Sequence, residues 1–487
     1  MRRSARRLLL ILAALAVAGL LAVAWILGRA VSGDWSALPA ELALRTPGEL
    51  IRRAQLRLQG HPLPEKLLLP PLSWIQRRVE RPPAGGLPTL GKGWQPRDGS
   101  SLLADMETDT VAVRSSDQLA RALAAARPGQ TIVLAPGTYR ITANLRTGAA
   151  GTQARQITVR SDTPQQTLIE STAVEGIVVD QPYWTFENLR IRGVCENDGY
   201  CEHAFHIVGN AHHTRIRNNL IEDFNAHLKI NGMGDSFPDH GLVERNTLTN
   251  TRVRNTHVPV TPIDLVAASR WVVADNLVSN FVKGRGDRIS YGIFMKGAGD
   301  GGRIERNLVI CTPGDLSVPG QRVGISFGGG GTGKPFCRDR ACEAEHTGGI
   351  VADNIVAHCN DFGIDVNRAA RTLVAHNTLV NTAGIDVRNA PASARIHGNL
   401  LEGRIRQRSG GELRAELNDT VDLRDYAAAP DALELAPTRA LDTIPSIALV
   451  PLDFCGRRRT DATPTGALAG PLPCGDARAL PSPTPAP

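Results

Sequence analysis

The sequence predicts an all-β protein, a single-stranded right-handed parallel β-helix (a solenoid) with an N-terminal capping helix, preceded by one transmembrane helix. Asparagine with apolar residues after it recurs at intervals of 22 to 47 residues, and several later repeats add a strand of the form Gly-Ile-x-apolar. A repeat this short cannot bury its apolar face alone, so neighbouring repeats must stack. Leucine-rich repeats are the main rival, but their leucine ladder is missing. The repeat asparagines are Asn188, Asn219, Asn246, Asn276, Asn307, Asn354, Asn377 and Asn399.

Residues 1–31 have the pattern of a membrane anchor. Arginines precede an uncharged run from Leu8 to Gly28. At about 1.5 Å per residue in a helix, the run is long enough to span the roughly 30 Å core of a bilayer. The positive-inside rule keeps the arginines in the cytoplasm. We therefore expect an inner-membrane anchor with the remaining chain facing the periplasm, and the alternative is secretion after cleavage of a signal peptide.

The remaining chain divides into three parts by composition. We expect a Pro-rich stalk or linker over 32–110, the β-helix domain over 111–470 and a disordered Pro-rich tail over 471–487. The formal net charge is +7, from 55 basic and 48 acidic residues, and five arginines near the N-terminus supply most of it. Nucleic-acid binding usually needs a clustered basic face, so we expect no nucleic-acid partner.

The chain contains eight cysteines, an even number, as expected for a protein with disulfides in an oxidising compartment. Three pairs are close in sequence. Cys311 and Cys359 follow successive repeat asparagines by four and five residues, so we expect them on adjacent rungs, within disulfide reach. A zinc site is the weaker alternative, because the His and Cys spacings do not fit one. The three local pairs are Cys195 with Cys201, Cys337 with Cys342, and Cys455 with Cys474.

Both ends of the repeat region carry motifs of a known superfamily. Residues 115–126 form an N-capped amphipathic pattern typical of a helix, and Arg127-Pro-Gly-Gln-Thr-Ile-Val-Leu-Ala-Pro-Gly-Thr-Tyr139 follows it. Asp453-Phe-Cys-Gly resembles a closing motif. The chain thus resembles the pectate-lyase-like superfamily, nearest to its chondroitinase-B and alginate-lyase branch. The resemblance implies a polysaccharide lyase that binds an acidic, uronate-containing polysaccharide on one exposed sheet, and it leaves calcium open as a cofactor.

Stacking of the Gly-Ile-x-apolar strands predicts two outward columns of side chains on one sheet, because alternate residues of a strand face out. Polar and ionisable residues concentrate in these columns. The first column reads His206, Lys229, Asp264, Phe294, Ser326, Asp365 and Asp386. The second column reads Val208, Asn231, Val266, Lys296, Gly328, Asn367 and Arg388.

β-Elimination from a uronate needs a base for the C5 proton and a cation that neutralises the carboxylate. Lys296, Lys229 and His206 are our candidates for the base, and Arg285 or Arg288 for the neutralising cation. The alternative for each is a solvated surface side chain. We expect the other polar residues of the sheet to bind substrate, namely Asn231, Asp264, Asn367, Asp365, Asp386 and Arg388.

Two other functions and one metal site remain open. Asp365 and Asp386 occupy equal positions one rung apart, as the paired carboxylates of a glycoside hydrolase would, although plain repetition also produces such a pair. A non-catalytic scaffold that binds glycan is the third reading. Calcium ligands could come from Glu196, Asp198 and Glu202 beside the first cysteine pair. The histidines do not form a zinc motif.

Overall fold

The computed structural model describes residues 51, 54, 55, 58, 62–79, 86–96 and 109–474, with gaps at 315, 330–331, 439 and 473. The predicted anchor and most of the predicted tail lie outside these residues. The chain divides into two units, Met1–Glu80 and Arg81–Pro487. The first unit contains helix α4, Pro62–Val79. In the described part of the chain, helices are too short or too polar to cross a membrane.

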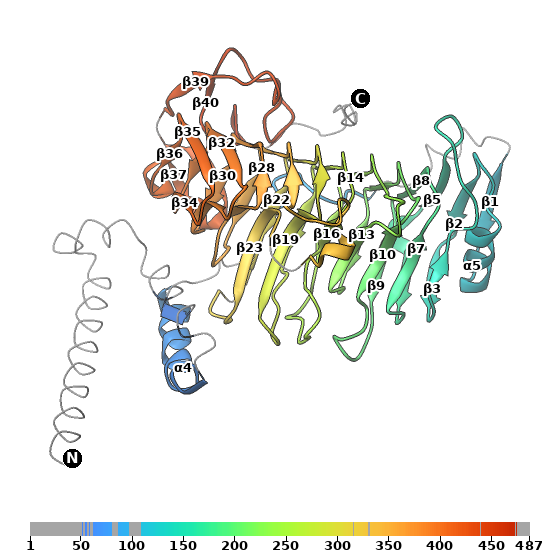
Figure 1. The fold of residues 1–487 in the computed structure, drawn as a ribbon. Coiled ribbons are helices and arrows are strands. Elements are labelled where there is room, and N and C mark those ends of the chain that lie inside the picture. The colour runs from blue at the N-terminus through green and yellow to red at the C-terminus, as the bar shows by residue number, and fades with distance from the viewer. Residues whose placement is uncertain are drawn as a thin grey trace, which may run out of the picture. The chain divides into compact units, whose positions relative to one another are not determined.

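The second unit is a parallel β-helix in which each full coil adds one strand to each of three sheets (Figure 1). Within each sheet the strands pair in parallel in the order in which they follow along the chain. Sheet A contains β1 Thr110–Val113, β2 Thr131–Leu134, β5 Ile157–Ser161, β8 Trp184–Glu187, β11 Arg215–Arg217, β14 Leu242–Glu244, β17 Val272–Ala274, β21 Arg303–Glu305, β25 Ile350–Ala352, β29 Thr372–Ala375, β32 Ser393–His397 and β35 Glu412–Glu416.

The other two large sheets complete the coils. Sheet B contains β3 Gly137–Ile141, β6 Thr167–Ser171, β9 Arg190–Gly193, β12 Leu220–Glu222, β15 Thr247–Thr249, β18 Leu277–Ser279, β22 Leu308–Ile310, β26 Ile355–Ala357, β30 Thr378–Val380, β33 Leu400–Leu401 and β36 Asp419–Thr420. Sheet C contains β4 Leu145–Arg146, β7 Glu175–Val179, β10 His203–Val208, β13 Ala226–Asn231, β16 Ile263–Val266, β19 Ile289–Lys296, β23 Gln321–Phe327, β27 Ile364–Asn367, β31 Gly384–Arg388 and β34 Arg404–Arg408.

Short elements fill the corners and the C-terminal end. They are the strands β20 Gly299–Asp300, β24 His346–Thr347 and β28 Ala369–Ala370, the hairpins β37 Ala427–Ala429 with β38 Glu434–Pro437 and β39 Thr443–Pro445 with β40 Ala462–Pro464, and the 3₁₀ turns η3 Pro164–Gln166, η4 Lys334–Phe336, η5 Leu423–Asp425 and η6 Pro430–Ala432. At the other end, helix α5, Ser116–Ala124, lies beside β1 and β2, which confirms the predicted capping helix (Figure 1). The Ser115 side chain accepts a hydrogen bond from the Gln118 amide at its N-terminus.

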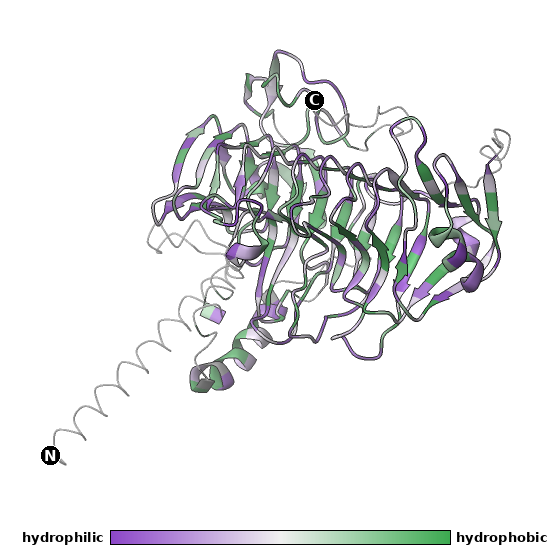
Figure 2. Ribbon diagram, turned by 45° about the vertical axis from the view of Figure 1, so that its right-hand side comes forward, coloured by the Kyte–Doolittle hydropathy of each residue, from purple (hydrophilic) through white to green (hydrophobic). Residues whose placement is uncertain are grey.

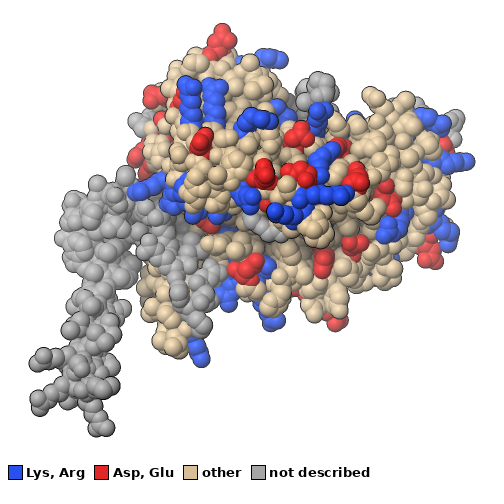
Figure 3. Space-filling model, viewed as in Figure 1, with Lys and Arg blue, Asp and Glu red and all other residues tan. Residues whose placement is uncertain are grey.

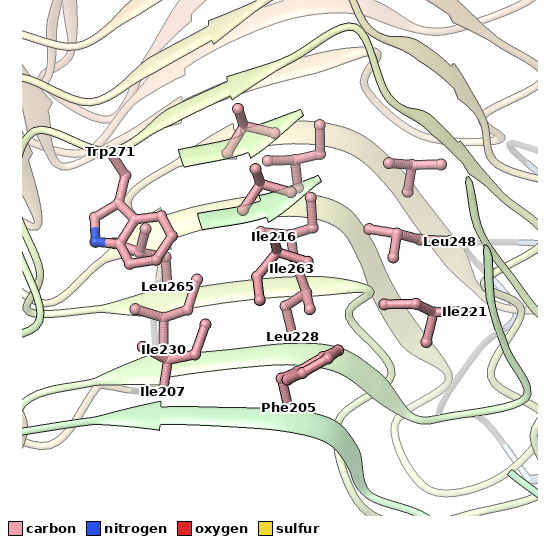
Figure 4. Close-up of a cluster of buried hydrophobic side chains, with 14 of the residues drawn as sticks. Phe205, Ile207, Ile216, Ile221, Leu228, Ile230, Leu248, Ile263, Leu265 and Trp271 are labelled. Atoms are coloured by element: carbon pink, nitrogen blue, oxygen red, sulfur yellow. The ribbon is translucent and has the colours of Figure 1, made fainter. Parts of the chain in front are cut away.

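The interior consists of apolar side chains stacked from coil to coil. Ile207, Ile230 and Leu265 form one buried row of sheet C, beside a row of Phe205, Leu228 and Ile263 (Figure 4). Their neighbours along each strand face outward, because side chains alternate. Figure 2 accordingly shows hydrophobic and hydrophilic residues interspersed along the strands of the solenoid.

The repeat asparagines form a continuous buried ladder at the corner between sheets A and B. Each side-chain amide from Asn219 to Asn377 donates to the Oδ1 atom of the next asparagine at 2.9–3.0 Å, and the same Oδ1 accepts the backbone N–H of the donating asparagine. Asn399 passes the ladder on to Asn418, which the repeat pattern missed. Each amide thereby satisfies a backbone group that would otherwise be buried without a partner.

The first repeat asparagine was assigned one residue too early. Leu189, not Asn188, occupies the position before Asn219, since its N–H donates to the Asn219 side chain. Asn188 lies in the preceding column, beside Asn218. Residues of that column have left-handed backbone conformations, which asparagine tolerates well, so the preference for asparagine there has a separate local cause.

A segment within the predicted stalk packs along the solenoid. Residues 87–95 cross the corner that holds the ladder, where the Trp94 amide donates to Thr247 Oγ1. Lys92 is buried there and its ammonium lies 2.6 Å from Asp275 and 2.5 Å from the Phe454 carbonyl oxygen. Burial lowers the pKa of Lys92, although the neighbouring Asp275 carboxylate opposes the shift.

All four predicted disulfides are confirmed. Cys195 bonds to Cys201, Cys337 to Cys342 and Cys455 to Cys474, each within one loop or closing segment. Cys311 and Cys359 follow the adjacent strands β22 and β26, with their Cα atoms 5.0 Å apart. The spacing of the repeats therefore located the one bridge that joins two coils.

We expect Asn307→Ala to lower the free energy of unfolding by about 3 kcal/mol, because Asn276 and Asn354 both lose a buried hydrogen-bond partner. Urea denaturation followed by circular dichroism measures the change. The control is Asn210→Ala, which removes an exposed asparagine. Equal stability of the two variants would contradict a stabilising role for the ladder.

Candidate functional site

The outward face of sheet C carries two columns of side chains in the predicted register. His206, Lys229 and Asp264 are successive Cα partners across β10, β13 and β16. Asn231, Val266 and Lys296 align in the second column. The predicted alignment is therefore confirmed over its first rungs as well. Further along, the face continues with Phe294, Ser326, Asp365, Asp386, Asn367 and Arg388.

Two lysines share one buried carboxylate at the centre of this face. Lys229 Nζ lies 2.5 Å from Asp264 Oδ2, and Lys296 Nζ lies 3.7 Å from Asp264 Oδ1. The Asp264 side chain is 7% exposed, whereas those of Lys229 and Lys296 are 23% and 17% exposed. Burial alone would raise the pKa of Asp264, but the two ammonium groups hold it below its usual range. Two ammonium groups thus lie on one buried carboxylate, and both lysines remain partly exposed to solvent.

Lys296 also rests on an aromatic pair. Its ammonium lies 4.2 Å from the centroid of the Phe294 ring, and the Tyr291 ring stacks on Phe294 with centroids 4.2 Å apart and planes 20° apart. Burial, reinforced by the Asp365 carboxylate, raises the pKa of Tyr291 to about 12. The phenol is therefore neutral at physiological pH. Phe294 itself is only 3% exposed, so a ligand at this place would meet Lys296 and the partly exposed Tyr291.

The N-terminal side of the cluster is acidic. His206 contacts Asn231 Oδ1 through Nε2 at 2.8 Å and Glu175 Oε1 through Nδ1 at 2.7 Å. Burial lowers the pKa of His203 to about 4, so this imidazole is neutral at physiological pH. Burial, together with Glu175, raises the pKa of Glu202. His206 is thus held between an amide and a carboxylate, two rungs from Asp264.

The two stacked aspartates are bound by arginines. Asp365 receives both a 2.9 Å and a 2.8 Å hydrogen bond from Arg388, and Asp386 receives bonds of 2.8 Å and 3.1 Å from Arg408. Both carboxylates are fully buried, whereas the side chains of Arg388 and Arg408 are 24% and 47% exposed. The arginines, not the aspartates, therefore face solvent. Asn367 completes this end through a 2.8 Å bond from Asn389.

The structure does not bring Arg285 and Arg288 to the lysines. Both precede β19, whereas Lys296 is its last residue. At roughly 3.3 Å per residue the strand separates Ile289 from Lys296 by about 23 Å. Arg285 is exposed in a loop in which Lys283 pairs with Asp287 at 2.7 Å. The prediction that grouped these arginines with Lys296 relied on their proximity in sequence and was wrong, because the two ends of an extended strand lie far apart.

A disulfide-bonded insertion between β23 and β24 folds back along the solenoid, crossing near β16 and β13 (Figure 1). It contacts the residue after Lys296, because the Arg338 amide donates to the Gly297 carbonyl. Its Arg338 forms a bidentate pair with Asp239, both bonds being 2.8 Å, and covers the Phe237 ring. Its Glu345 is buried and accepts the Gly297 N–H at 3.0 Å, next to Lys296. Burial raises the pKa of Glu345. Sequence reasoning missed both contacts, since only the folded insertion reaches back.

A second missed feature does have a sequence signal. Arg404-Ile-Arg-Gln-Arg408 forms the edge strand β34, in which alternation turns all three arginines outward. Arg406 continues the first column beyond Asp386, and Arg408 pairs with Arg388 in the second. In the view of Figure 3, basic and acidic side chains interleave over the face on which the sheet C strands of Figure 1 lie.

Asp198, one of the three residues considered for calcium, is already bound by arginines. Asp198 is buried, and its carboxylate already binds Arg252 at 2.6 Å and Arg254 at 3.1 Å. Burial would raise its pKa, but these guanidinium groups and the Asn255 amide hold it low. On sheet C, Asp264, Asp365 and Asp386 are likewise paired with cations. Over the described residues, His, Cys, Asp and Glu do not gather in a group of three that could hold a metal ion.

Comparison with known proteins adds information on the fold. Neither a family model nor a curated protein matches the chain. The solved structure of pectate lyase Pel9A matches with a TM-score of 0.57 and 13% identity, over 76% of this chain and 99% of that one. An alginate lyase from Paenibacillus sp. str. FPU-7 matches at a TM-score of 0.37 and 14% identity, over 65% and 97% of the two chains. The likeness to Pel9A supports the fold, a right-handed parallel β-helix.

We expect a double-mutant cycle to give a larger coupling energy for Asp264 with Lys229 than for Asp264 with Lys296. The 2.5 Å contact should couple by about 2 kcal/mol, and the 3.7 Å contact by less. The variants are Asp264→Asn, Lys229→Met, Lys296→Met and the two double variants, compared by urea denaturation. Equal couplings would show that the two lysines are held alike.

Proposed function

We propose that this chain is a polysaccharide lyase that cleaves an acidic, uronate-containing polysaccharide by β-elimination on the outward face of sheet C. The observation that carries the proposal is the pair Lys229 and Lys296 on the buried Asp264 carboxylate. The fold that the chain shares with pectate lyase Pel9A agrees with it. The site offers the two elements that the reaction needs, a base and a cation for the substrate carboxylate.

The two lysines take different roles because they are held differently. Lys229 is fixed to Asp264 at 2.5 Å, so it serves as the stationary cation that binds the uronate carboxylate. Lys296 is 3.7 Å from the same carboxylate and lies over Phe294, which leaves its amine freer to reach substrate. In its neutral form, Lys296 removes the C5 proton. The electron pair of that bond forms the C4–C5 double bond, the C4–O bond breaks, and the leaving oxygen takes a proton from water.

His206 is a weaker candidate for the base. Both of its ring nitrogens already have close partners, Asn231 and Glu175. We assign to it the positioning of Asn231, whose side chain stands next to the lysines in the second column. Phe294 is buried and supports Tyr291, and the partly exposed Tyr291 is the aromatic residue that a sugar ring can contact.

The hydrolase alternative is not favoured by the geometry. General acids and bases must reach the substrate, and the Asp365 and Asp386 carboxylates are fully buried beneath Arg388 and Arg408. Their role on this face is to orient the arginines. A scaffold that binds glycan without cleaving it would use the same cations. Only a measurement of product formation distinguishes it from the lyase.

We further propose that the protein works outside the cytoplasm, anchored in the inner membrane by its N-terminal run. Four disulfides support an oxidising compartment. The run Leu8–Gly28 lies outside the described residues, so this part of the proposal rests on the sequence.

The proposed reaction predicts an unsaturated product, visible as ultraviolet absorbance of the conjugated double bond. Full-length protein is assayed with polygalacturonate, alginate, chondroitin and hyaluronan, and absorbance and reducing ends are followed together. We expect Lys296→Met to lower kcat by about 10³-fold, as expected for loss of a general base.

Lys334→Met is the matched control, since it removes an exposed lysine of η4 and should leave the rate unchanged. Reducing ends without absorbance would assign a hydrolase. Binding without either signal would assign the scaffold, and an unaffected Lys296→Met variant would remove that lysine from the reaction.

We expect EDTA to leave the initial rate unchanged on the substrate that is cleaved. The reason is that the aspartates of the sheet C face are paired with lysine or arginine and are not free to bind a divalent cation. Rates are measured with EDTA and with added calcium. Loss of activity that calcium restores would show that the ion joins the site, held in part by the substrate.

A further inference from the structure

Charge is distributed unevenly along the outward face of sheet C. Beyond Lys296, toward the C-terminal end, the face carries Arg388, Arg404, Arg406 and Arg408 against Asp365 and Asp386. Asp361 lies nearby, and desolvation raises its pKa to about 6. Even when Asp361 is ionised, arginines outnumber carboxylates at this end. On the opposite side of the lysines stand Glu175 and Glu202, with a neutral His203.

Buried aspartates fix two of the arginines at the C-terminal end in position, and their side chains remain open to an anion. Buried Asp365 and Asp386 fix the guanidinium groups of Arg388 and Arg408 through two hydrogen bonds each, and both arginines remain partly exposed. Arg406 has no acidic partner within 4 Å among the residues that the structure describes. Arg406 and Arg408 both lie over the ring of Phe362, at 5.7 and 5.5 Å. Guanidinium groups fixed in this way lose little freedom when they bind a carboxylate.

The position of these arginines along the solenoid matches an extended ligand. Arg388 is three strands from Lys296 and Arg408 is four, through β23, β27, β31 and β34. At roughly 4.8 Å per strand these separations are about 14 and 19 Å. A polymer lying along the stacked strands from Lys296 would therefore reach the arginines with a later sugar residue, not with the one that reacts.

We infer that Arg388, Arg406 and Arg408 form a carboxylate-binding subsite for a remote residue of the polyuronate, so that the chain extends from Lys296 toward the C-terminal coils. This inference rests on the proposed function and adds the direction of binding to it. Glu175 and Glu202 disfavour an anionic sugar on the other side of the lysines. The ligand is a polymer that carries carboxylates several residues apart.

The test measures binding separately from catalysis, in full-length protein carrying Lys296→Met to stop turnover. Polygalacturonate and alginate are titrated by calorimetry, with neutral dextran as a reference. Arg406→Gln with Arg408→Gln should weaken binding about tenfold, through loss of two charge-assisted contacts. The matched control is Arg395→Gln with Arg414→Gln, which removes two exposed charges from sheet A at the same end.

Equal weakening by the two pairs would overturn the subsite, because it would reduce the effect to net charge. Arg408→Gln leaves the buried Asp386 with only Arg388, at 3.4 Å, so Arg406→Gln is also measured alone. That variant should weaken binding without changing the melting temperature. With Lys296 intact, the site pair should raise KM and leave kcat unchanged. Product formation with unaltered KM overturns the subsite alone. If the protein with Lys296 intact makes no product, but the site pair still weakens binding more than the control pair does, the lyase proposal alone is overturned. If the protein does not bind polyuronate at all, both proposals are overturned.

Discussion

The buried asparagine ladder is the constraint on which the rest of the structure depends. Each asparagine amide joins two coils and satisfies a backbone N–H and a carbonyl oxygen at the same corner. A coil displaced by one residue would break these bonds and turn its apolar side chains out of the core. The ladder thus fixes the register of all three sheets. It also determines which residues of each coil face outward on sheet C, and Lys229, Asp264 and Lys296 meet only in that register.

The sheet C face shows how a solenoid can present cations in fixed positions. A lysine or arginine on an isolated exposed strand would sample many conformations. Here a buried aspartate beneath each cluster holds the cations, Asp264 for the lysines and Asp365 and Asp386 for the arginines. The low polarity around these aspartates strengthens the attraction, and removal of one would leave cations unpaired. From the sequence, these aspartates are candidates for catalysis or for substrate binding. In the structure they hold in place the lysines and arginines that face solvent.

The insertion and the segment 87–95 show how parts outside the repeat join the same architecture. The insertion returns from β23 to contact Phe237 and Asp239, and brings Glu345 beside Lys296. The segment 87–95 places buried Lys92 on Asp275 in the corner beside the ladder. The Arg338–Asp239 and Lys92–Asp275 pairs both join residues far apart in the chain. In each pair a long cationic side chain from outside the repeat reaches a carboxylate of the solenoid.

The sequence by itself determined the repeat, the capping helix, the four disulfides and the two outward columns, because each follows from a local pattern: the recurring asparagine, the helix cap, the short cysteine spacings and the alternation of side chains along a strand. It also placed Lys229, Lys296 and Asp264 on one face. It erred by one residue at Asn188, where two adjacent columns both favour asparagine, and it grouped Arg285 with Lys296, although a strand separates them. Only the tertiary structure decided which of the charged residues are buried and paired. Periodicity tells which way a side chain points, whereas ion pairing depends on distances between coils and on loops that fold back, and these exist only once the coils have stacked.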